Sequence, residues 1–237
     1  MTIKSAKHFF QFSLVTITIF CGYIFAAVNS EGTTETAATE TAANTPAPNI
    51  LTSFSEGAHY ITKFPDSSRA KGPVVVEFFS YMCPHCYRLE GTVKRWLKQK
   101  PEGVEFVKIP VAFQGNRLYA LSAKAHYIAE ELNIVDKFGD FMFKRIHLDR
   151  RPPRNDRDLA NIFKELGVSD ADYKKASENN FNVESKLRRA NFLMNQYQVN
   201  GVPYILVNYK YEVGQESYKS EESLFNLWNN LPYKDFK

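Results

Sequence analysis

The chain has 237 residues, of which 44% are hydrophobic and 14% aromatic. This is enough for one domain with a packed core, and it excludes a disordered protein. The formal net charge is +4, and Lys4 and Lys7 belong to an N-terminal segment without acidic residues. With those two set aside from the 30 basic residues, 28 remain against 26 acidic residues. This near balance argues against a dedicated nucleic-acid-binding protein.

The N-terminal segment is typical of an export signal. Lys4 and Lys7 form a positively charged start, and a mostly apolar run of 20 residues follows over 9–28. We expect residues 1–30 to be either a cleaved signal peptide or a retained N-terminal membrane anchor, because a run of about 20 apolar residues is long enough to span a bilayer. A buried helix of a soluble domain is the third alternative. Cys21 lies in this run after residues that fit a lipidation signal poorly, so we expect no lipid there.

The composition divides the remaining chain into a linker and a folded part. Residues 31–50 are rich in Thr, Ala, Glu, Asn and Pro and carry almost no large apolar side chains, which predicts a flexible linker. We expect the folded part to begin with residues 51–115, to continue with a helical insertion over 116–196, and to close with residues 197–237.

The first folded segment has a β-α-β pattern. Residues 74–79 form a β-branched and aromatic run, which is typical of a strand buried on both faces. Residues 84–99 have helical spacing, and residues 104–113 predict a second strand. A right-handed crossover would make the two strands parallel neighbours. The buried stripe expected for the helix consists of Tyr87, Leu89, Val93, Trp96 and Leu97.

The rest of the chain predicts a helical block and then a β-β-α segment. The predicted helices cover residues 118–132, 134–146, 158–166, 171–177 and 183–197. The closing segment is predicted as a strand over 204–207, a hairpin turn at 208–210, a strand over 211–213 and a helix that Ser220 can cap.

Beyond the N-terminal segment, the chain has two cysteines, Cys83 and Cys86. A disulfide between them closes a very short loop, which contributes about 2 kcal/mol by chain entropy, against about 4.7 kcal/mol for a loop of about 100 residues. The spacing therefore favours redox chemistry over an inert structural cross-link. A zinc site needs about four ligands, and no second Cys-x-x-Cys or His pair is present, so we expect no metal. His126 and His147 are interpreted as ordinary helix residues.

The position of Cys83 favours a reactive thiol. It follows a predicted strand and begins a predicted helix, with Pro84 at the first helical position, where proline fits well. The free backbone N–H groups and the dipole at a helix start stabilise a thiolate. His85 can add a hydrogen bond or a positive charge. A stable thiolate favours the reduced form, so the disulfide becomes a stronger oxidant. Cys86, one turn later, is expected to be the more buried, resolving thiol.

The run from Glu77 to Tyr87, which contains Cys83-Pro84-His85-Cys86, resembles the active-site segment of the DsbA family. Further similar stretches are Pro101-Glu102-Gly103-Val104 followed by Lys108, Gly201-Val202-Pro203 before an apolar strand, and Val207-Asn208-Tyr209-Lys210-Tyr211. The likeness covers about residues 54–237, whereas the linker has no counterpart in the simplest members. It implies an α/β, thioredoxin-like fold, in which helices flank a central β-sheet, with an inserted all-helical domain.

The resemblance also implies roles for individual residues. Cys83 and Cys86 would form the redox-active disulfide, with Cys83 the nucleophile that holds a mixed disulfide and Cys86 the thiol that resolves it. Pro203 would be a cis-proline facing the disulfide, and Val202 would pair with an extended substrate chain. The alternative for Pro203 is an ordinary loop proline.

Four further residues are candidates for supporting roles. Glu77 is on a strand expected to be buried, where a carboxylate is costly unless paired or protonated, and Lys108 on the neighbouring strand is the natural partner. In the family the matching residues form a buried acidic–basic pair beneath the disulfide, and we expect Glu77 and Lys108 to tune or relay protons for Cys86. The alternative is a solvent-exposed strand end or a purely structural ion pair. Met82, together with Tyr81, would present exposed apolar surface beside the thiol that suits unfolded substrates.

We therefore expect a thiol:disulfide oxidoreductase, an enzyme that introduces disulfide bonds into exported proteins. Its expected partners are unfolded exported proteins with free thiols and a DsbB-like, quinone-linked membrane reoxidase; no nucleic acid and no organic cofactor are expected. The expected location is the periplasm, either free or tethered to the inner membrane through residues 9–28, and the expected state is a monomer. The alternatives are an envelope disulfide reductase or isomerase, and a non-catalytic folding chaperone that retains the motif.

Overall fold

Five strands form one mixed sheet in the order β1-β5-β4-β2-β3 in this computed structural model. The structure describes residues 54–178 and 180–236, so the predicted signal or anchor and the predicted linker lie outside the described residues. The strands are β1 (Tyr60–Thr62), β2 (Val74–Phe79), β3 (Glu105–Pro110), β4 (Tyr204–Val207) and β5 (Tyr211–Val213). The helices are α1 (Pro84–Leu97), α2 (Arg117–Glu131), α3 (Val135–His147), α4 (Asp156–Glu165), α5 (Asp170–Ser177), α6 (Phe181–Gln196) and α7 (Glu221–Asn230). Two short 3-10 helices cover Gln215–Lys219 and Leu231–Asp235.

The β2-α1-β3 unit is the part of the fold that carries the cysteines. β2 and β3 pair in parallel, as predicted, and Glu77 lies opposite Lys108 in their register. The remaining pairs, β2 with β4, β4 with β5 and β5 with β1, are antiparallel. β3 is shorter than the predicted strand, because residues 111–113 leave the sheet after Pro110 and lead toward α2. The α/β, thioredoxin-like fold class is confirmed.

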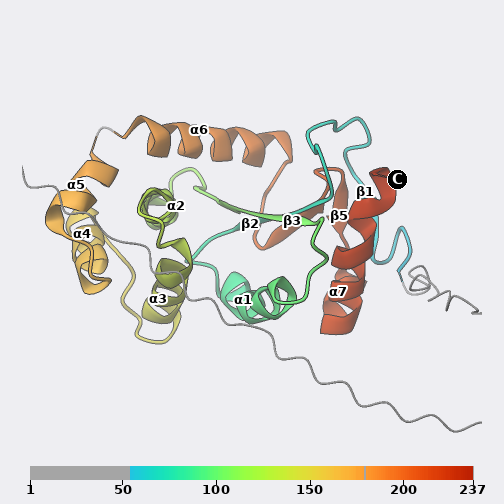
Figure 1. The fold of residues 1–237 in the computed structure, drawn as a ribbon, viewed down its shortest axis with the longest axis horizontal. Coiled ribbons are helices and arrows are strands. Elements are labelled where there is room, and N and C mark those ends of the chain that lie inside the picture. The colour runs from blue at the N-terminus through green and yellow to red at the C-terminus, as the bar shows by residue number, and fades with distance from the viewer. Residues whose placement is uncertain (1–53, 179, 237) are drawn as a thin grey trace, which may run out of the picture. The chain divides into compact units, whose positions relative to one another are not determined.

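Each face of the sheet is covered by helices. Figure 1 shows α6 over one face and α1 and α7 over the other. Side chains alternate along β2, so Val76 and Phe78 join the apolar cluster on the α6 side, whereas Val75 joins Trp96 and Trp228 on the other side. Glu77 shares the side of Val75 by the same alternation, and this side faces α1.

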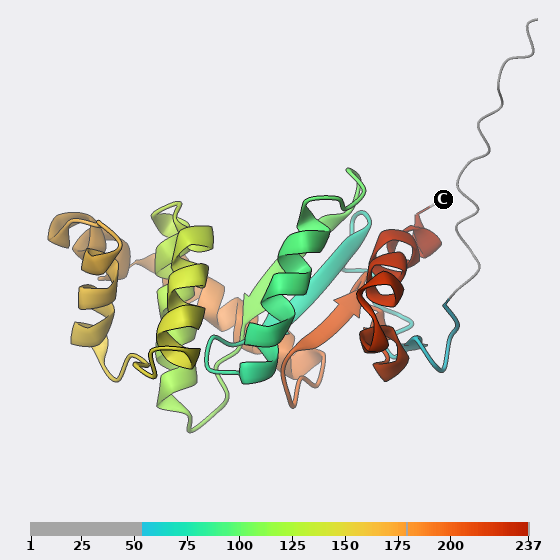
Figure 2. The same cartoon turned by 90° about the horizontal axis from the view of Figure 1, so that it is seen from below.

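Helices α2 to α5 lie beside the sheet, next to β3, as Figures 1 and 2 show. Their apolar residues continue the cluster on the α6 side, and Phe138, Ile162 and Phe163 are fully buried in it. Side-chain caps begin several helices: Asn155 Oδ1 accepts from the Asp158 amide at 2.9 Å, and Ser220 Oγ accepts from the Ser223 amide at 3.0 Å, as predicted.

Two sequence-based expectations about the fold were incomplete or wrong. The pattern before residue 74 did not predict β1, which is only three residues long and exists through its pairing with β5. Leu97 was expected on the buried stripe of α1, but it is 39% exposed, because α1 buries mainly Cys86, Val93 and Trp96. In the part of the chain that the structure describes, no helix is both long and apolar enough to cross a membrane.

Candidate redox site

Cys83 is the N-cap of α1 and lies just beyond the carboxyl end of β2. Figure 2 shows α1 starting beside the carboxyl ends of β2 and β3. The Cys83 backbone is extended, with φ −88° and ψ 119°, and Pro84 begins the helix. Cys83 Sγ accepts a hydrogen bond from the Cys86 amide at 3.4 Å. The loop before it is held by Ser80, whose carbonyl accepts from the Cys83 amide at 3.1 Å and whose hydroxyl accepts from the Met82 amide at 3.1 Å.

The two cysteines are not joined by a disulfide, and their thiol pKa values are shifted in opposite directions. A hydrogen bond from the Cys86 thiol to the Cys83 thiolate, together with the backbone amides of Cys86 and His85, lowers the pKa of Cys83 from 9.0 to about 6, although burial acts in the opposite direction. The same bond raises the pKa of Cys86 far above its usual range, with burial and the Glu77 charge adding to the effect. Cys83 is 5% exposed and Cys86 is fully buried. The arrangement therefore supplies one nucleophilic thiolate and one protonated thiol.

The loop before β4 faces this thiolate from the opposite side. The Val202–Pro203 peptide bond is cis, and in its protonated form the Cys83 thiol donates to the Val202 carbonyl at 3.1 Å. Both loop residues are half-buried. The structure thus brings together residues 119 positions apart in the chain, and the Val202 backbone lies where an extended peptide bound at Cys83 could pair with it.

Glu77 and Lys108 meet on the inner side of α1, away from the exposed edge. Lys108 Nζ lies 3.6 Å from Glu77 Oε2 and 2.5 Å from Glu90 Oε2, and 4.4 Å from the centre of the Phe79 ring. Burial raises the pKa of Glu77 to about 7, against the opposing attraction of Lys108. Burial lowers the pKa of Lys108, but Glu77 and Glu90 outweigh it, so the net shift is upward. Glu90 is the third member of this ionic cluster, and the sequence alone did not single it out.

A helix-face argument could have found Glu90. It lies four positions after Cys86 on α1, so both side chains share one face of that helix. Cys86 faces the sheet, and the register places Lys108 on the next strand. Within the described residues, neither carboxylate oxygen of Glu77 has a hydrogen-bond partner, so the ionic attraction of Lys108 is its main compensation.

The two residues between the cysteines are exposed. Pro84 is the first residue of α1, and its ring faces solvent. His85 accepts a hydrogen bond at Nδ1 from Arg88 Nη2 at 2.8 Å. Met82 is half-buried beside them, which leaves part of its side chain at the surface next to Cys83.

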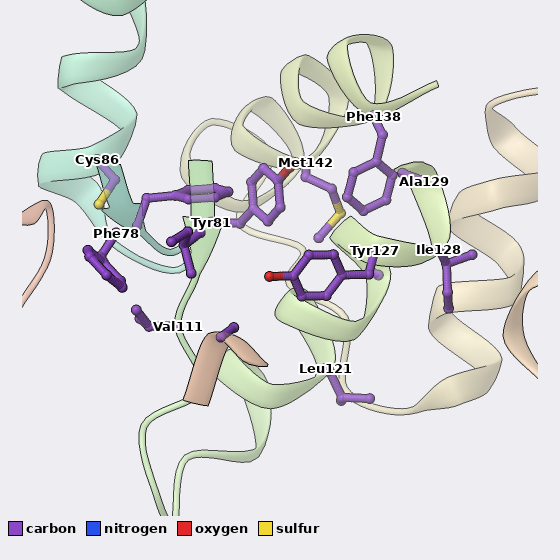
Figure 3. Close-up of a cluster of buried hydrophobic side chains, with 14 of the residues drawn as sticks. Phe78, Tyr81, Cys86, Val111, Leu121, Tyr127, Ile128, Ala129, Phe138 and Met142 are labelled. Carbon is purple, nitrogen blue, oxygen red and sulfur yellow. The ribbon is translucent and has the colours of Figure 1, made fainter. Parts of the chain in front are cut away.

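Tyr81 was expected at the surface beside Met82, and this expectation was wrong. Tyr81 is 2% exposed. Figure 3 shows its ring between Cys86 and the buried side chains Met142 and Phe138. The Tyr81 ring fills the space between the sheet and α3. Its burial removes a large apolar surface from water, which favours the buried position.

Two histidines of the helical block hold Tyr81. His126 Nε2 donates to Glu130 at 3.2 Å, so its Nδ1 accepts from the Tyr81 hydroxyl at 2.8 Å. Burial lowers the pKa of His126, which keeps the ring neutral. His147 Nε2 donates to the Tyr81 carbonyl at 2.8 Å and its ring stacks on Tyr87 at 4.9 Å. Both histidines lie on helices, as expected, and their long-range hydrogen bonds hold Tyr81 and its backbone beside the active-site loop.

No cluster of three or more His, Cys, Asp or Glu side chains with metal-binding geometry occurs within residues 54–178 and 180–236. A pocket of about 520 Å³ lies beside the site, and its lining includes His85 and Pro203. This geometry suits thiol–disulfide exchange. The partners are the Cys83 thiolate, the buried Cys86 thiol and the sulfur of a third group that approaches along the Val202 backbone.

Comparison with known proteins places this site in a described family. Residues 74–225 match the DSBA-like thioredoxin domain. The thiol:disulfide interchange protein DsbA of Burkholderia cepacia is 31% identical over 150 residues, which is 63% of this chain and 69% of that protein. The crystal structure of Pseudomonas aeruginosa DsbA superposes with a TM-score of 0.66 at 27% identity, over 77% of this chain and 94% of that chain. A Proteus mirabilis DsbA with a non-covalently bound peptide, PWATCDS, superposes with a TM-score of 0.63 at 26% identity, over 77% of this chain and 100% of that chain.

Proposed function

Because this chain belongs to the family of DSBA-like thioredoxin domains and is a thiol:disulfide oxidoreductase, we propose that it introduces disulfide bonds into unfolded exported proteins through Cys83 and Cys86. The observation that carries the proposal is the pair of opposite thiol acidities at the start of α1, with the pKa of Cys83 lowered to about 6 and Cys86 buried and protonated. Such a pair releases Cys83 as a good leaving group and keeps Cys86 inside.

The proposed reaction proceeds in two exchange steps. A client thiolate attacks Cys83 Sγ of the Cys83–Cys86 disulfide, a client–Cys83 disulfide forms, and the electron pair of the broken bond goes to Cys86, which takes up a proton. A second client thiolate then attacks the client sulfur of the mixed disulfide, and Cys83 leaves as a thiolate. The client loses two electrons and two protons, and the enzyme is reduced to the dithiol.

The acidity of Cys83 favours this direction. At pH 7, a fall of the thiol pKa from 9.0 to about 6 stabilises the reduced form by about 1.4 kcal/mol, which corresponds to about 30 mV for a two-electron couple. The stabilisation is complete above the ordinary thiol pKa and is lost as the pH falls through about 6, because protonation then removes the thiolate. The pair is therefore more oxidising at neutral pH than a dithiol with ordinary acidities.

The exposed residues of the site would bind and orient the client. Val202 would pair its backbone with an extended client segment, with Pro203 placing that backbone opposite Cys83. Met82 would supply apolar contact beside the thiolate. Pro84 starts the helix that stabilises the thiolate, and His85 donates its backbone amide to it and adds charge when protonated.

Glu77 and Lys108 would serve Cys86 from the inner side. With a pKa of about 7, the Glu77 carboxyl group is partly protonated at neutral pH. It can therefore donate a proton to the Cys86 thiolate when the disulfide is broken. The Glu77 charge also raises the pKa of Cys86. Lys108 would stabilise the buried Glu77 carboxylate after the proton has moved.

The cellular context completes the proposal. We propose that residues 1–30 direct export to the periplasm, as a cleaved signal or as an anchor, and that residues 31–50 link them to a catalytic part formed by residues 51–115 and 197–237 around the helical insertion of 116–196. The enzyme would act as a monomer, and a quinone-linked membrane reoxidase of the DsbB type would restore its disulfide.

Oxidative refolding of a reduced, unfolded client protein tests the proposal. The oxidised enzyme should accelerate the loss of client thiols, and Cys83→Ser should abolish the effect. Cys86→Ser should be inactive in the same assay, because it cannot form the disulfide. When Cys86→Ser is offered a client that already contains a disulfide, its Cys83 thiolate should attack that bond, release one client thiol and accumulate the Cys83–client disulfide, visible by mass spectrometry. Equilibration with glutathione gives the potential of the pair. A potential as reducing as that of thioredoxin, about −270 mV, or equal activity in Cys83→Ser, would overturn the proposed direction or the proposed site.

A further inference from the structure

We propose that Arg88 selects client segments that carry a carboxylate side chain close to their reactive cysteine. The inference rests on the proposed function, since it concerns the clients of the same site. Arg88 is exposed on the first turns of α1. It was not singled out from the sequence, because an arginine on an exposed helix face has no distinctive pattern.

The pocket of about 520 Å³ beside Cys83 places Arg88 in the path of a client. His85 from the first turn of α1 and Pro203 from the facing loop both line it, and Cys83 contacts Val202, the neighbour of Pro203, so the pocket lies next to the reactive sulfur. Arg88 and Thr92 continue one wall along α1, and Tyr204 and Glu212 form part of the other. A client segment that pairs with the loop before β4 would direct alternate side chains into this space.

The charges that line the pocket are unequally compensated. Among the described residues that line it, Arg88 and Glu212 are the side chains with a fixed charge. Glu212 Oε2 is occupied by Lys63 Nζ at 2.5 Å and by the Tyr204 hydroxyl at 2.9 Å. Arg88 forms no ion pair with any described carboxylate, and its hydrogen-bond partner is the His85 ring. The pocket therefore offers a client one uncompensated positive charge.

The contact between Arg88 and His85 leaves the guanidinium ready for a better acceptor. A guanidinium has donors only, so His85 Nδ1 must be the acceptor, and the ring is neutral in this arrangement. A bond from a guanidinium to a carboxylate is charge-assisted on both sides and can be bidentate, so it is stronger than a bond to a neutral ring nitrogen. A client carboxylate would replace His85 at Arg88, whereas a client lysine would meet repulsion from Arg88 and find Glu212 already paired.

Oxidation of matched dithiol peptides tests the selection. Three peptides with the same pair of cysteines carry Glu, Gln or Lys on both sides of one cysteine. The oxidised full chain is mixed with each peptide, the reaction is quenched with acid, and mass spectrometry gives the second-order rate of peptide disulfide formation. Flanking charges change the reactivity of the peptide thiol itself, so the quantity compared between enzymes is the ratio of the Glu-peptide rate to the Lys-peptide rate.

The enzymes compared are the wild type, Arg88→Gln, Arg88→Glu and the control Arg157→Glu. Arg157 is an exposed arginine on α4 that does not line the pocket, so this control changes the net charge equally. We expect the rate ratio to fall about 2- to 3-fold in Arg88→Gln and about 5- to 10-fold in Arg88→Glu, and to stay near the wild-type value in the control. Salt at about 0.5 M should reduce these differences, because it screens a partly exposed pair.

An equal rate ratio in the wild type and both Arg88 variants would overturn the selection while leaving the proposed function intact, because the peptides would still be oxidised. A fall of the same size in Arg157→Glu would also overturn it, since the effect would then follow from net charge alone. If none of the enzymes oxidised any peptide, the proposed function would fail, and the selection with it.

Discussion

Replacement of the buried carboxylate in β2, Glu77→Gln, should stabilise the reduced protein, and increasingly so as the pH rises. The Glu77 pKa is raised from 4.5 to about 7 by burial, and the side chain is fully buried. The folded state therefore binds more protons than the unfolded state between these values, so the stability of the wild type falls as the pH rises through this window. Glutamine keeps the shape and does not ionise.

The size of the effect follows from the two pKa values of Glu77. The linkage relation gives a cost of ionisation in the folded state of about 0.8 kcal/mol at pH 5, about 3 kcal/mol at pH 7 and about 3.3 kcal/mol at pH 8. Lys108 keeps its partner Glu90 in the variant, so no new unpaired charge offsets the gain. Glu77→Gln should exceed the wild type in the free energy of unfolding by up to these amounts.

Urea unfolding of the reduced protein at pH 5, 7 and 8 measures this difference, provided that the dependence on urea is the same in both proteins. Glu105→Gln is the matched control, because Glu105 is exposed on β3, and a change there should stay within about 0.5 kcal/mol at every pH. A difference between wild type and Glu77→Gln that is independent of pH would refute the reasoning, because Glu77 would then not titrate in this window.

Three further outcomes are expected around the same site. Cys86→Ala should move the alkylation-detected titration of Cys83 from about 6 to higher pH, and Cys86→Ser less so, because serine still offers a donor to the thiolate. Lys108→Met should lower the free energy of unfolding by about 3 kcal/mol at pH 8 and by less at pH 5, where Glu77 is protonated; equal losses at both pH values would contradict the pairing. His147→Ala should cost about 1–2 kcal/mol in urea unfolding, because it removes the hydrogen bond to the active-site loop and the ring stacked on α1.

The local parts of the fold were predictable because short-range physics encodes them. The apolar run of β2 and the helical spacing after Pro84 predicted the strand and the helix, and their junction placed Cys83 at the helix start. The hairpin turn was also readable: Asn208 and Tyr209 both adopt positive φ, a conformation typical of two-residue hairpin turns. β1 was not predicted, because three residues form a strand there only through pairing with β5.

The sequence by itself determined the chemistry of the site: two cysteines at helical spacing, a proline and a histidine between them, and a strand before them. Tertiary structure decided the environment of that chemistry, since residues such as Glu90 and His147 acquire their roles from partners on other elements. The uncompensated charge of Arg88 has the same origin, because it depends on Glu212 being paired with Lys63 from a distant segment. Local propensity places a side chain on an element, and only packing of the elements decides which charges are paired and which remain free for a client.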